Sequence, residues 1–336
     1  MRKSAVLVGV LAVFAFAAAF AWSDKSPDRS PQSTAQPAAR KLGLHVQGRD
    51  VVEAGGTPFV MRGISHPYAW MKDQGQAFAD VKRLGANTVR VVLTSEVGAS
   101  EVADVIATCK QQRLICVLEN HDTTGYGDQA GAATLDRVAD WWAGLRDVLA
   151  GQEDYVVVNI GNEPYGNSGT GEWTAATSAA IGKLRAAGLR HLLMADAPNW
   201  GQDWSGVMRD NAASVLAGDP LHNTVFSVHM YGVYGTADKV TTYLDAFHER
   251  GLPLVVGEFG WKHTDGAVAD EAIMRAAQER GIGYLGWSWS GNSGGVEYLD
   301  AAAGFDAERL TDWGRRLFAG IKETAREATV FATASR

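Results

Sequence analysis

The sequence predicts an α/β fold, a single (β/α)8 TIM barrel with a short N-terminal hairpin that closes the barrel floor. Three observations lead to this prediction. Short, apolar, β-branched runs alternate with amphipathic stretches eight times within about 270 residues, as in this fold. A glycine separates a predicted helix from the following strand at Gly85, Gly188, Gly251 and Gly281, where left-handed geometry ends a helix. Polar side chains gather directly after the predicted strands, at the rim where barrels of this class carry their functional residues.

Eight apolar runs are predicted to be strands that are buried on both faces, because they lack the polar alternation of a half-exposed strand. These runs are Phe59–Gly63, Thr88–Leu93, Leu114–Glu119, Val156–Asn159, Leu192–Asp196, Thr224–Val228, Leu254–Gly257 and Gly283–Trp287. Before the first strand, Leu44–Ala54 predicts the floor hairpin, with Gly48-Arg49-Asp50 as its turn. An open, doubly wound sheet is the alternative fold, but no glycine-rich phosphate-binding turn follows the first strand.

Amphipathic stretches between and after the strands predict the helices. They cover Gln76–Leu84, Ser100–Gln112, Thr134–Leu149, Thr174–Ala187, Gly206–Ala217, Ala237–Arg250, Val268–Arg280 and Thr311–Ala325. Ser100 and Thr174 stand at helix starts, where a hydroxyl oxygen can accept an amide hydrogen bond. Helix, glycine and strand in that order favour the barrel over separate domains.

The N-terminus predicts a signal peptide over residues 1–21. Arg2 and Lys3 precede an apolar stretch, and Ala19-Phe20-Ala21 fits the small-x-small rule for cleavage after Ala21. An uncleaved anchor is the alternative, because the apolar stretch is near the lower length limit of a membrane span. We therefore expect a secreted, extracellular protein without membrane contact after cleavage.

Three further segments follow the predicted signal peptide. Residues 22–40 are rich in Ser, Pro, Gln and Ala and predict a disordered linker. Residues 41–325 form the predicted barrel domain, and 326–336 a C-terminal tail. Cys109 and Cys116 are predicted to be two buried thiols in preference to a bridge, although their spacing leaves a disulfide open.

A net charge of −7 argues against nucleic acid as a partner, and we expect a monomer. The 11 tryptophans suit flat sugar faces, although most tryptophans in a protein serve packing. The histidines match no zinc-binding spacing, so we expect no catalytic metal and no cofactor. A structural calcium ion is left open, because acidic loop residues are plentiful.

Two glutamates stand out as candidate catalytic residues. Glu163 lies in VVVNIGNEPYG and Glu258 in LVVGEFGW, and each closely follows a buried strand. A single glutamate in such a place is often a solvated loop residue or an ion-pair partner. Two glutamates at one rim of the sheet cost desolvation and repel each other, so their presence suggests a chemical role. Cleavage of a glycosidic bond requires such a pair of carboxylates.

Other polar and aromatic side chains fall at the same predicted rim. They are His66, Arg90, His121, Asn162, Asp196, Trp200, His229, Tyr231, Trp261, Trp287 and Trp289. Structural explanations compete for several of them. Arg90 could be a buried ion-pair partner, and Trp289 could equally belong to the core. His121 or His229 taken alone could be a structural histidine.

Three motifs resemble glycoside hydrolase family 5 of clan A: NEP after the fourth strand, H-x-Y after the sixth and GEFG after the seventh. HDTTGYG, NIGNEPYGN, DAPNWGQDW, FSVHMYGVY and GYLGWSWSGN are similar to stretches of the secreted bacterial endo-β-1,4-mannanases in that family. The resemblance covers roughly Leu44 to Asp306.

The resemblance implies a role for each residue. Glu163 is the general acid and then the general base, and Glu258 is the nucleophile, which Arg90 and Tyr231 keep ionised. Pro164 is expected to hold Glu163 in an extended conformation. Asn162 meets the sugar 2-hydroxyl. The remaining implied contacts to carboxylates or sugar come from His121, His229, Trp287, Trp200, Trp204, Trp261 and His66 with Trp70.

The expected reaction is hydrolysis of internal β-1,4-mannosidic bonds in mannan, galactomannan and glucomannan, with retention of anomeric configuration. Retention predicts two carboxyl groups about 5–5.5 Å apart and a bell-shaped pH profile. A β-1,4-glucanase on the same fold is the nearest alternative, since glucose and mannose differ only at C2. A non-catalytic glycan-binding protein and a metal-dependent barrel enzyme are more distant ones.

Overall fold

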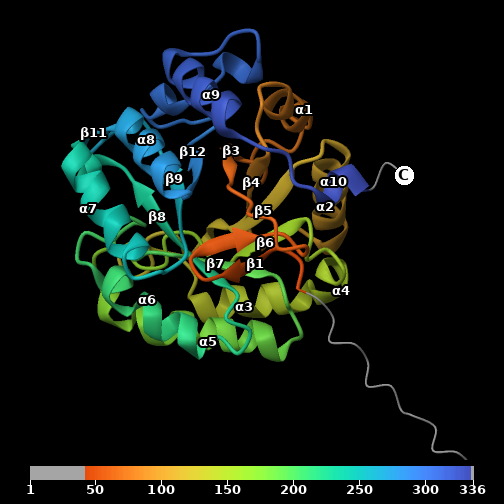
Figure 1. Ribbon diagram of the computed structural model, residues 1–336, viewed down its shortest axis with the longest axis vertical. Coiled ribbons are helices and arrows are strands. Elements are labelled where there is room, and N and C mark those ends of the chain that lie inside the picture. Colours follow the sequence, from red (N-terminus) through yellow and green to blue (C-terminus); the bar gives the residue numbers. More distant parts are fainter. Residues whose placement is uncertain (1–41, 334–336) are drawn as a thin grey trace, which may run out of the picture. The chain divides into compact units, whose positions relative to one another are not determined.

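The computed structural model describes residues 42–333, in which eight parallel strands close into a barrel (Figure 1). Around the barrel the order is β12-β3-β4-β5-β6-β7-β8-β9, so the first and last strands of the series are neighbours. The barrel strands are β3 (Arg62–His66), β4 (Thr88–Leu93), β5 (Ile115–Asn120), β6 (Val156–Asn159), β7 (Leu192–Asp196), β8 (Thr224–Met230), β9 (Leu254–Phe259) and β12 (Gly283–Gly286). The predicted (β/α)8 barrel is confirmed.

Helices follow the strands and surround the barrel. They are α1 (Gln76–Arg83), α2 (Ala99–Gln111), α3 (Leu135–Gly144), α4 (Arg146–Leu149), α5 (Trp173–Ala186), α6 (Val207–Gly218), α7 (Ala237–His248), α8 (Asp270–Arg280), α9 (Asp312–Thr324) and α10 (Val330–Thr333). Short 3-10 turns lie in the connections: η1 (His121–Thr123), η2 (Thr170–Glu172), η3 (Gly232–Tyr234), η4 (Glu297–Leu299) and η5 (Ala303–Phe305). Within the described residues, no helix is long and apolar enough to cross a membrane.

Most predicted elements agree with the observed ones to within two residues at each end, with two notable differences. The first strand begins at Arg62 instead of Phe59, because Phe59 and Met61 pack into the cluster at the barrel floor. The single helix predicted over Thr134–Leu149 is divided at Leu145 into α3 and α4. The four helix-ending glycines all have positive φ, as predicted.

The N-terminal hairpin pairs β1 (His45–Gln47) with β2 (Asp50–Val52) in antiparallel register. Leu44 joins a buried cluster with Phe59 and Met61 at the floor, where the prediction placed the hairpin. The predicted tail also reaches this cluster, since Phe331 of α10 is buried in it. Glu53 accepts hydrogen bonds from the amides of Thr329 and Val330 and so holds α10 in place. The signal peptide and linker predictions lie outside the described residues.

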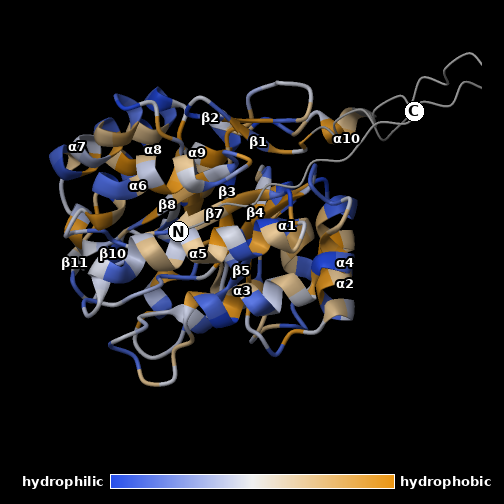
Figure 2. Ribbon diagram, turned by 90° about the horizontal axis from the view of Figure 1, so that it is seen from below, coloured by the Kyte–Doolittle hydropathy of each residue, from blue (hydrophilic) through white to orange (hydrophobic). Residues whose placement is uncertain are grey.

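Alternating side chains of each strand fill two separate cores. On β5, Cys116 and Leu118 pack outward against the helices, whereas Ile115 and Val117 point into the barrel. Orange, hydrophobic ribbon accordingly gathers at the strands in Figure 2, and blue segments lie along the outer helices. Cys109 and Cys116 are buried and free, with Sγ atoms 2.9 Å apart.

Candidate active site

The candidate site begins where the inward-facing positions of the strands change from apolar to polar. On β5, β6 and β7 the inward positions run from Val117 to Glu119, from Val157 to Asn159 and from Met194 to Asp196. An apolar layer therefore fills the lower barrel, and a polar layer lies above it at the C-terminal ends of the strands. Arg90 stands at the centre of the polar layer and is fully buried.

A β-bulge turns Glu258 into this layer. Val228 pairs with Val256, but the next residue of β8, His229, pairs with Glu258, which leaves Gly257 as an extra residue in β9. Strict alternation from the inward-facing Val255 would direct Glu258 toward the helices. A Cβ atom on Gly257 would lie 2.0 Å from Oγ of Ser227, so the bulge requires glycine.

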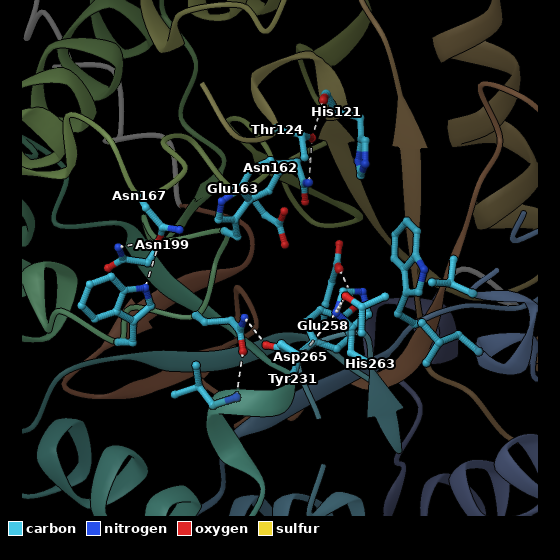
Figure 3. Close-up of a pocket in the computed structure, with 18 residues that line it drawn as sticks. His121, Thr124, Asn162, Glu163, Asn167, Asn199, Tyr231, Glu258, His263 and Asp265 are labelled. Carbon is cyan, nitrogen blue, oxygen red and sulfur yellow. Dashed lines mark hydrogen bonds and ion pairs between the residues drawn. The ribbon is translucent and has the colours of Figure 1, made fainter. Parts of the chain in front are cut away.

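The two glutamates face each other across one cavity, as Figure 3 shows. Carboxylate oxygens of Glu163 and Glu258 lie within 4.8 Å of each other. Both side chains are largely buried, with 11% and 5% of their surface exposed. The predicted meeting of the two carboxylates at one rim is therefore what the fold produces.

Glu258 is held by two donors. Nη1 of Arg90 lies 2.5 Å from its Oε1, and the hydroxyl of Tyr231 donates to its Oε2 over 2.8 Å. Burial disfavours the guanidinium charge, but Glu119, Glu258 and Asp196 raise the pKa of Arg90 above its ordinary value, so the cation persists. Burial, together with Glu258 and Glu163, raises the pKa of Tyr231 well above its ordinary value, so the phenol remains a donor.

Glu163 has different surroundings. Its Oε1 lies 2.8 Å from Nδ1 of His229, and its backbone oxygen accepts a hydrogen bond from the amide of Gly125. The expectation of an extended conformation before Pro164 is wrong, because the φ of Glu163 is +42°. The loop after β5 holds this left-handed conformation, since Thr124 bridges to Pro164 and the amide of Gly125 bonds to Glu163.

The cavity between the glutamates measures about 650 Å³. Trp287 and His121 form one wall, with their rings stacked at 5.8 Å between centroids. His121 also contacts Glu119 through Nδ1, and this carboxylate raises the pKa of His121 although burial opposes the shift. Asn162 lies on the wall, where its Oδ1 accepts from Arg90 and its Nδ2 donates to Thr124.

Aromatic residues from the loops extend the site. Trp200 and the exposed Trp204 line the cavity, and Trp70 lines a neighbouring hollow that shares His121 and Thr124 with it. Trp289 is fully buried and belongs to the core.

The structure does not bring Trp261 or His66 to the cavity wall. The indole of Trp261 donates to the backbone oxygen of Tyr298 and packs against that residue in the outer loops. His66 is buried against Phe78 and Phe305, and burial lowers its pKa to about 4, so its ring is neutral. His66 is the last residue of β3 and Trp261 follows β9 by two residues, but both side chains turn into packing contacts.

Sequence reasoning missed the part of the wall that long loops supply. Gln202 and Asp265 line the cavity and are hydrogen-bonded to each other, although neither lies at a strand end. Asp265 also accepts from the amide of Gly232. The one sequence signal that could have indicated these loops is the cluster of polar residues in GQDW and in HTDG.

Among the described residues, Glu163, His229 and Glu258 are the one group whose ligand atoms are close enough to surround a cation. The Arg90 cation and the Tyr231 hydroxyl already bind one oxygen each of Glu258, and a cation beside the site disfavours a metal ion, so this arrangement suits a reacting carboxylate pair better than a metal centre. Two acids in unlike surroundings can divide the roles of nucleophile and proton donor.

Comparison with known proteins gives consistent matches. The family model described as cellulase (glycosyl hydrolase family 5) matches residues 52–293. A mannan endo-1,4-beta-mannosidase of Streptomyces lividans is 58% identical over 298 residues, covering 86% of this chain and 78% of the relative. The solved beta-mannanase of Thermomonospora fusca is 55% identical with a TM-score of 0.85, covering 86% of this chain and 99% of that one. A mannohexaose complex of the Thermomonospora fusca enzyme superposes with a TM-score of 0.84 at 55% identity, with the same coverage of both chains.

Proposed function

This chain belongs to glycosyl hydrolase family 5, and on that premise we propose that it is a mannan endo-1,4-β-mannosidase that acts with retention of configuration. The observation that carries the proposal is the pair of carboxylates, Glu163 and Glu258, within 4.8 Å of each other in one cavity. Retaining glycosidases place their carboxyl groups about 5–5.5 Å apart, whereas inverting enzymes need about 6.5–9.5 Å to admit a water molecule.

The unequal surroundings of the two acids assign their roles. Glu258 accepts hydrogen bonds from Arg90 and Tyr231, which can stabilise a carboxylate, so it attacks the anomeric carbon. Glu163 protonates the leaving glycosidic oxygen in the same step, and a covalent glycosyl-enzyme results. Glu163, now a carboxylate, then removes a proton from water, which attacks the anomeric carbon, releases Glu258 and restores the configuration.

The cavity wall supports binding of a β-linked mannan chain. Trp287 offers a flat indole beside the reacting carboxylates, a surface on which a sugar ring can stack. Asn162 carries its amide next to Glu163, where the 2-hydroxyl of a mannose residue would lie. The relatives named above act on mannan or bind mannohexaose, and mannan, galactomannan and glucomannan are the substrates that we assign to this chain.

A β-1,4-glucanase is the remaining alternative, because the family model bears the description cellulase. Parallel assays on linear mannan, galactomannan and carboxymethylcellulose separate the two activities. We expect hydrolysis of both mannans into short oligosaccharides and little release from carboxymethylcellulose. Faster hydrolysis of carboxymethylcellulose would reverse the assignment.

Secretion and the monomeric state are further parts of the proposal. The basic and apolar residues before Ala21 support export and cleavage, and N-terminal sequencing of the protein from culture medium should give Trp22 as the first residue. Size-exclusion chromatography with light scattering should give the mass of a single chain.

Replacement of the nucleophile tests the proposed reaction. We expect Glu258→Ala to lose at least about 10⁴-fold in kcat on mannan, because no other group at the site can form the glycosyl-enzyme. Added azide should restore part of the turnover and release an α-mannosyl azide, which would report the vacated position on the nucleophile's face. Full turnover by Glu258→Ala would contradict the proposal.

A further inference from the structure

Asp196 lies at the end of β7, beneath the cavity, and has no assigned role in the reaction. Its side chain is fully buried and does not line the cavity wall. Asn159 donates to its Oδ1 over 2.9 Å, and Nη2 of Arg90 lies 3.5 Å from its Oδ2. A buried carboxylate is costly unless donors and cations surround it, and an apolar side chain would pack here at lower cost.

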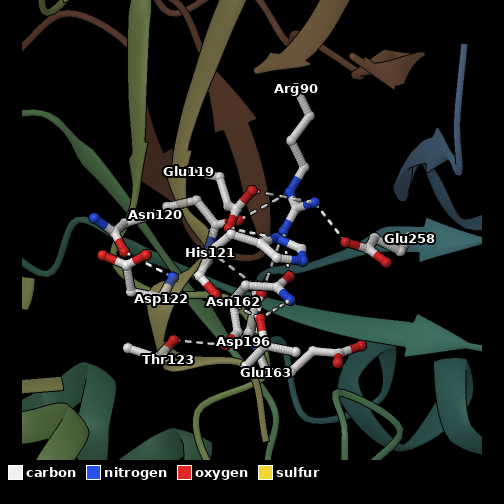
Figure 4. Close-up of polar contacts among 12 residues, drawn as sticks. Arg90, Glu119, Asn120, His121, Asp122, Thr123, Asn162, Glu163, Asp196 and Glu258 are labelled. Atoms are coloured by element: carbon white, nitrogen blue, oxygen red, sulfur yellow. Dashed lines mark hydrogen bonds and ion pairs between the residues drawn. The ribbon is translucent and has the colours of Figure 1, made fainter. Parts of the chain in front are cut away.

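Asp196 and Glu163 contact opposite nitrogens of the same imidazole. Oε1 of Glu163 is hydrogen-bonded to Nδ1 of His229 over 2.8 Å. Oδ2 of Asp196 lies 3.2 Å from Nε2 at ion-pair distance, although the angle is not that of a hydrogen bond. The backbone amide of Glu163 also lies 3.4 Å from Oδ2 of Asp196. Figure 4 shows Asp196 and Glu163 side by side below Arg90. Asp196 therefore contacts Glu163 in two ways, through the imidazole of His229 and through the backbone amide of Glu163 itself.

We propose that Asp196 is a positioning residue that keeps a proton on Nε2 of His229, so that Nδ1 stays directed at Glu163 throughout the reaction. The inference rests on the function proposed above, because it assigns the means by which Glu163 changes between acid and base. Asp196 accepts no proton itself. Its negative charge fixes the ring orientation and stabilises the imidazolium, as an acid behind a catalytic histidine does.

The charges around the pair agree with this role. Burial opposes both charged forms, but Glu258 and Asp196 raise the pKa of His229 to about 10, and His229 and Arg90 hold the pKa of Asp196 below its ordinary value. Glu258 lies 3.6 Å from Nδ1 of His229 and accepts a hydrogen bond from Tyr231. Glu119 lies 3.8 Å from Arg90 and 3.1 Å from His121. A fixed negative charge on Asp196 thus favours the protonated form of His229, whose Nδ1 faces Glu163.

Asp196→Asn tests the inference, because it keeps the size of the side chain and removes its charge. We expect kcat on mannan to fall about 100-fold, within the range that general acid–base assistance supplies, while KM changes little because Asp196 does not touch the cavity. On a 2,4-dinitrophenyl β-mannobioside, whose leaving group needs no protonation, we expect a loss of less than about fivefold in kcat/KM. The pH above which kcat/KM declines should move down by about one unit.

Asp219→Asn is the matched control. Asp219 is also fully buried and also bonds to an arginine, Arg185, but it lies beside Thr224 at the opposite end of the barrel strands. We expect this variant to lose thermal stability and to keep the leaving-group dependence and the pH profile of the wild type. Equal losses on mannan and on the dinitrophenyl substrate in Asp196→Asn would overturn the inference, because they would indicate an effect through Arg90 and the nucleophile.

A measurement on the wild type keeps the test decisive if Asp196→Asn fails to fold. With ¹⁵N-labelled histidine, and with the His229 signals assigned from a His229→Gln variant, Nε2 should carry a proton at every pH at which the enzyme is active. An unprotonated Nε2 at neutral pH would overturn the inference. A wild-type protein without activity on mannan would instead refute the proposed function, whatever the state of this nitrogen.

Discussion

Charge balance at single residues decides what the cavity can do. Arg90 alone faces three buried carboxylates, those of Glu119, Asp196 and Glu258, at 3.8, 3.5 and 2.5 Å. The shortest contact goes to Glu258, so the guanidinium attracts that carboxylate most strongly. Glu163 and Glu258 have the same side chain, but their different neighbours suit them to different chemical roles.

Tyr231→Phe should weaken the nucleophile without disturbing the fold. The variant keeps the ring and removes the hydroxyl that donates to Oε2 of Glu258 over 2.8 Å. A hydrogen bond to a charged group contributes about 1.5–3 kcal/mol, so we expect kcat/KM on mannan to fall roughly 10- to 100-fold. Initial rates at several mannan concentrations would measure the change.

The matched control for this variant is Tyr243→Phe. Tyr243 is another buried tyrosine, whose hydroxyl donates to Asp203 over 2.7 Å, outside the residues that hold the two glutamates. It should lose stability and keep its kcat/KM. Unchanged activity in Tyr231→Phe would remove this tyrosine from the proposed mechanism.

At the scale of elements, backbone irregularities place the reacting groups. The bulge at Gly257 in β9 turns Glu258 inward, and the loop after β7 brings Gly201 against the ring of His229. Gly201 has φ +72°, and its carbonyl oxygen accepts a hydrogen bond from the amide of His229 in β8. This loop therefore supports the ring that contacts Glu163.

Gly201→Ala should impair catalysis through this contact. A Cβ atom at this position would lie 2.5 Å from Nδ1 of His229, so the imidazole or the loop must shift and disturb the contact with Glu163. We expect kcat to fall at least about tenfold, because misplacement of a catalytic neighbour by about 1 Å can cost a hundredfold. The measurement is kcat on mannan beside the thermal midpoint of unfolding.

Gly281→Ala serves as its control, because Gly281 also has positive φ, +68°, and has no atom within 4 Å of an added Cβ. Both variants carry a similar backbone penalty of about 1–2 kcal/mol. Only Gly201→Ala should lose activity beyond the loss of folded protein. Equal kcat values in the two variants would show that the loop does not position His229.

At the scale of the whole molecule, buried histidines predict how stability depends on pH. Burial lowers the pKa of His66 and of His191 to about 4, from an ordinary value of 6.5. The unfolded chain takes up these protons first, so the free energy of unfolding should fall as the pH drops from about 6.5 to about 4. The pKa of His229 is raised to about 10 by Glu258 and Asp196 against the effect of burial, so its contribution is complete below pH 6.5 and is lost as the pH rises to about 10.

Urea denaturation at about pH 4.5, 6.5 and 9 would measure this dependence, with the highest stability expected near the middle value. His191→Gln should flatten the acidic side only, and His229→Gln the alkaline side only. A stability that is constant across this range would contradict the assigned protonation states.

Local sequence patterns were enough to predict the barrel and the two glutamates. Runs such as Thr88–Leu93 and Val156–Asn159 carry their own strand signal, and a glycine after a helix marks its end, because these preferences act between neighbours in the chain. Placement of Glu163 and Glu258 at strand ends follows from the same signals. Their common rim follows from the parallel order of the strands.

Tertiary structure alone decided which side chains reach the cavity and with what charge. The bulge at Gly257, the left-handed φ of Glu163 and the wall formed by Gln202 and Asp265 each depend on contacts between distant segments. Trp261 and His66 occupy strand ends as well, yet packing turns them away from the cavity. The sequence sets which residues stand at the rim, because secondary structure is local. The closed barrel sets their direction and protonation, because these depend on neighbours that only folding brings together.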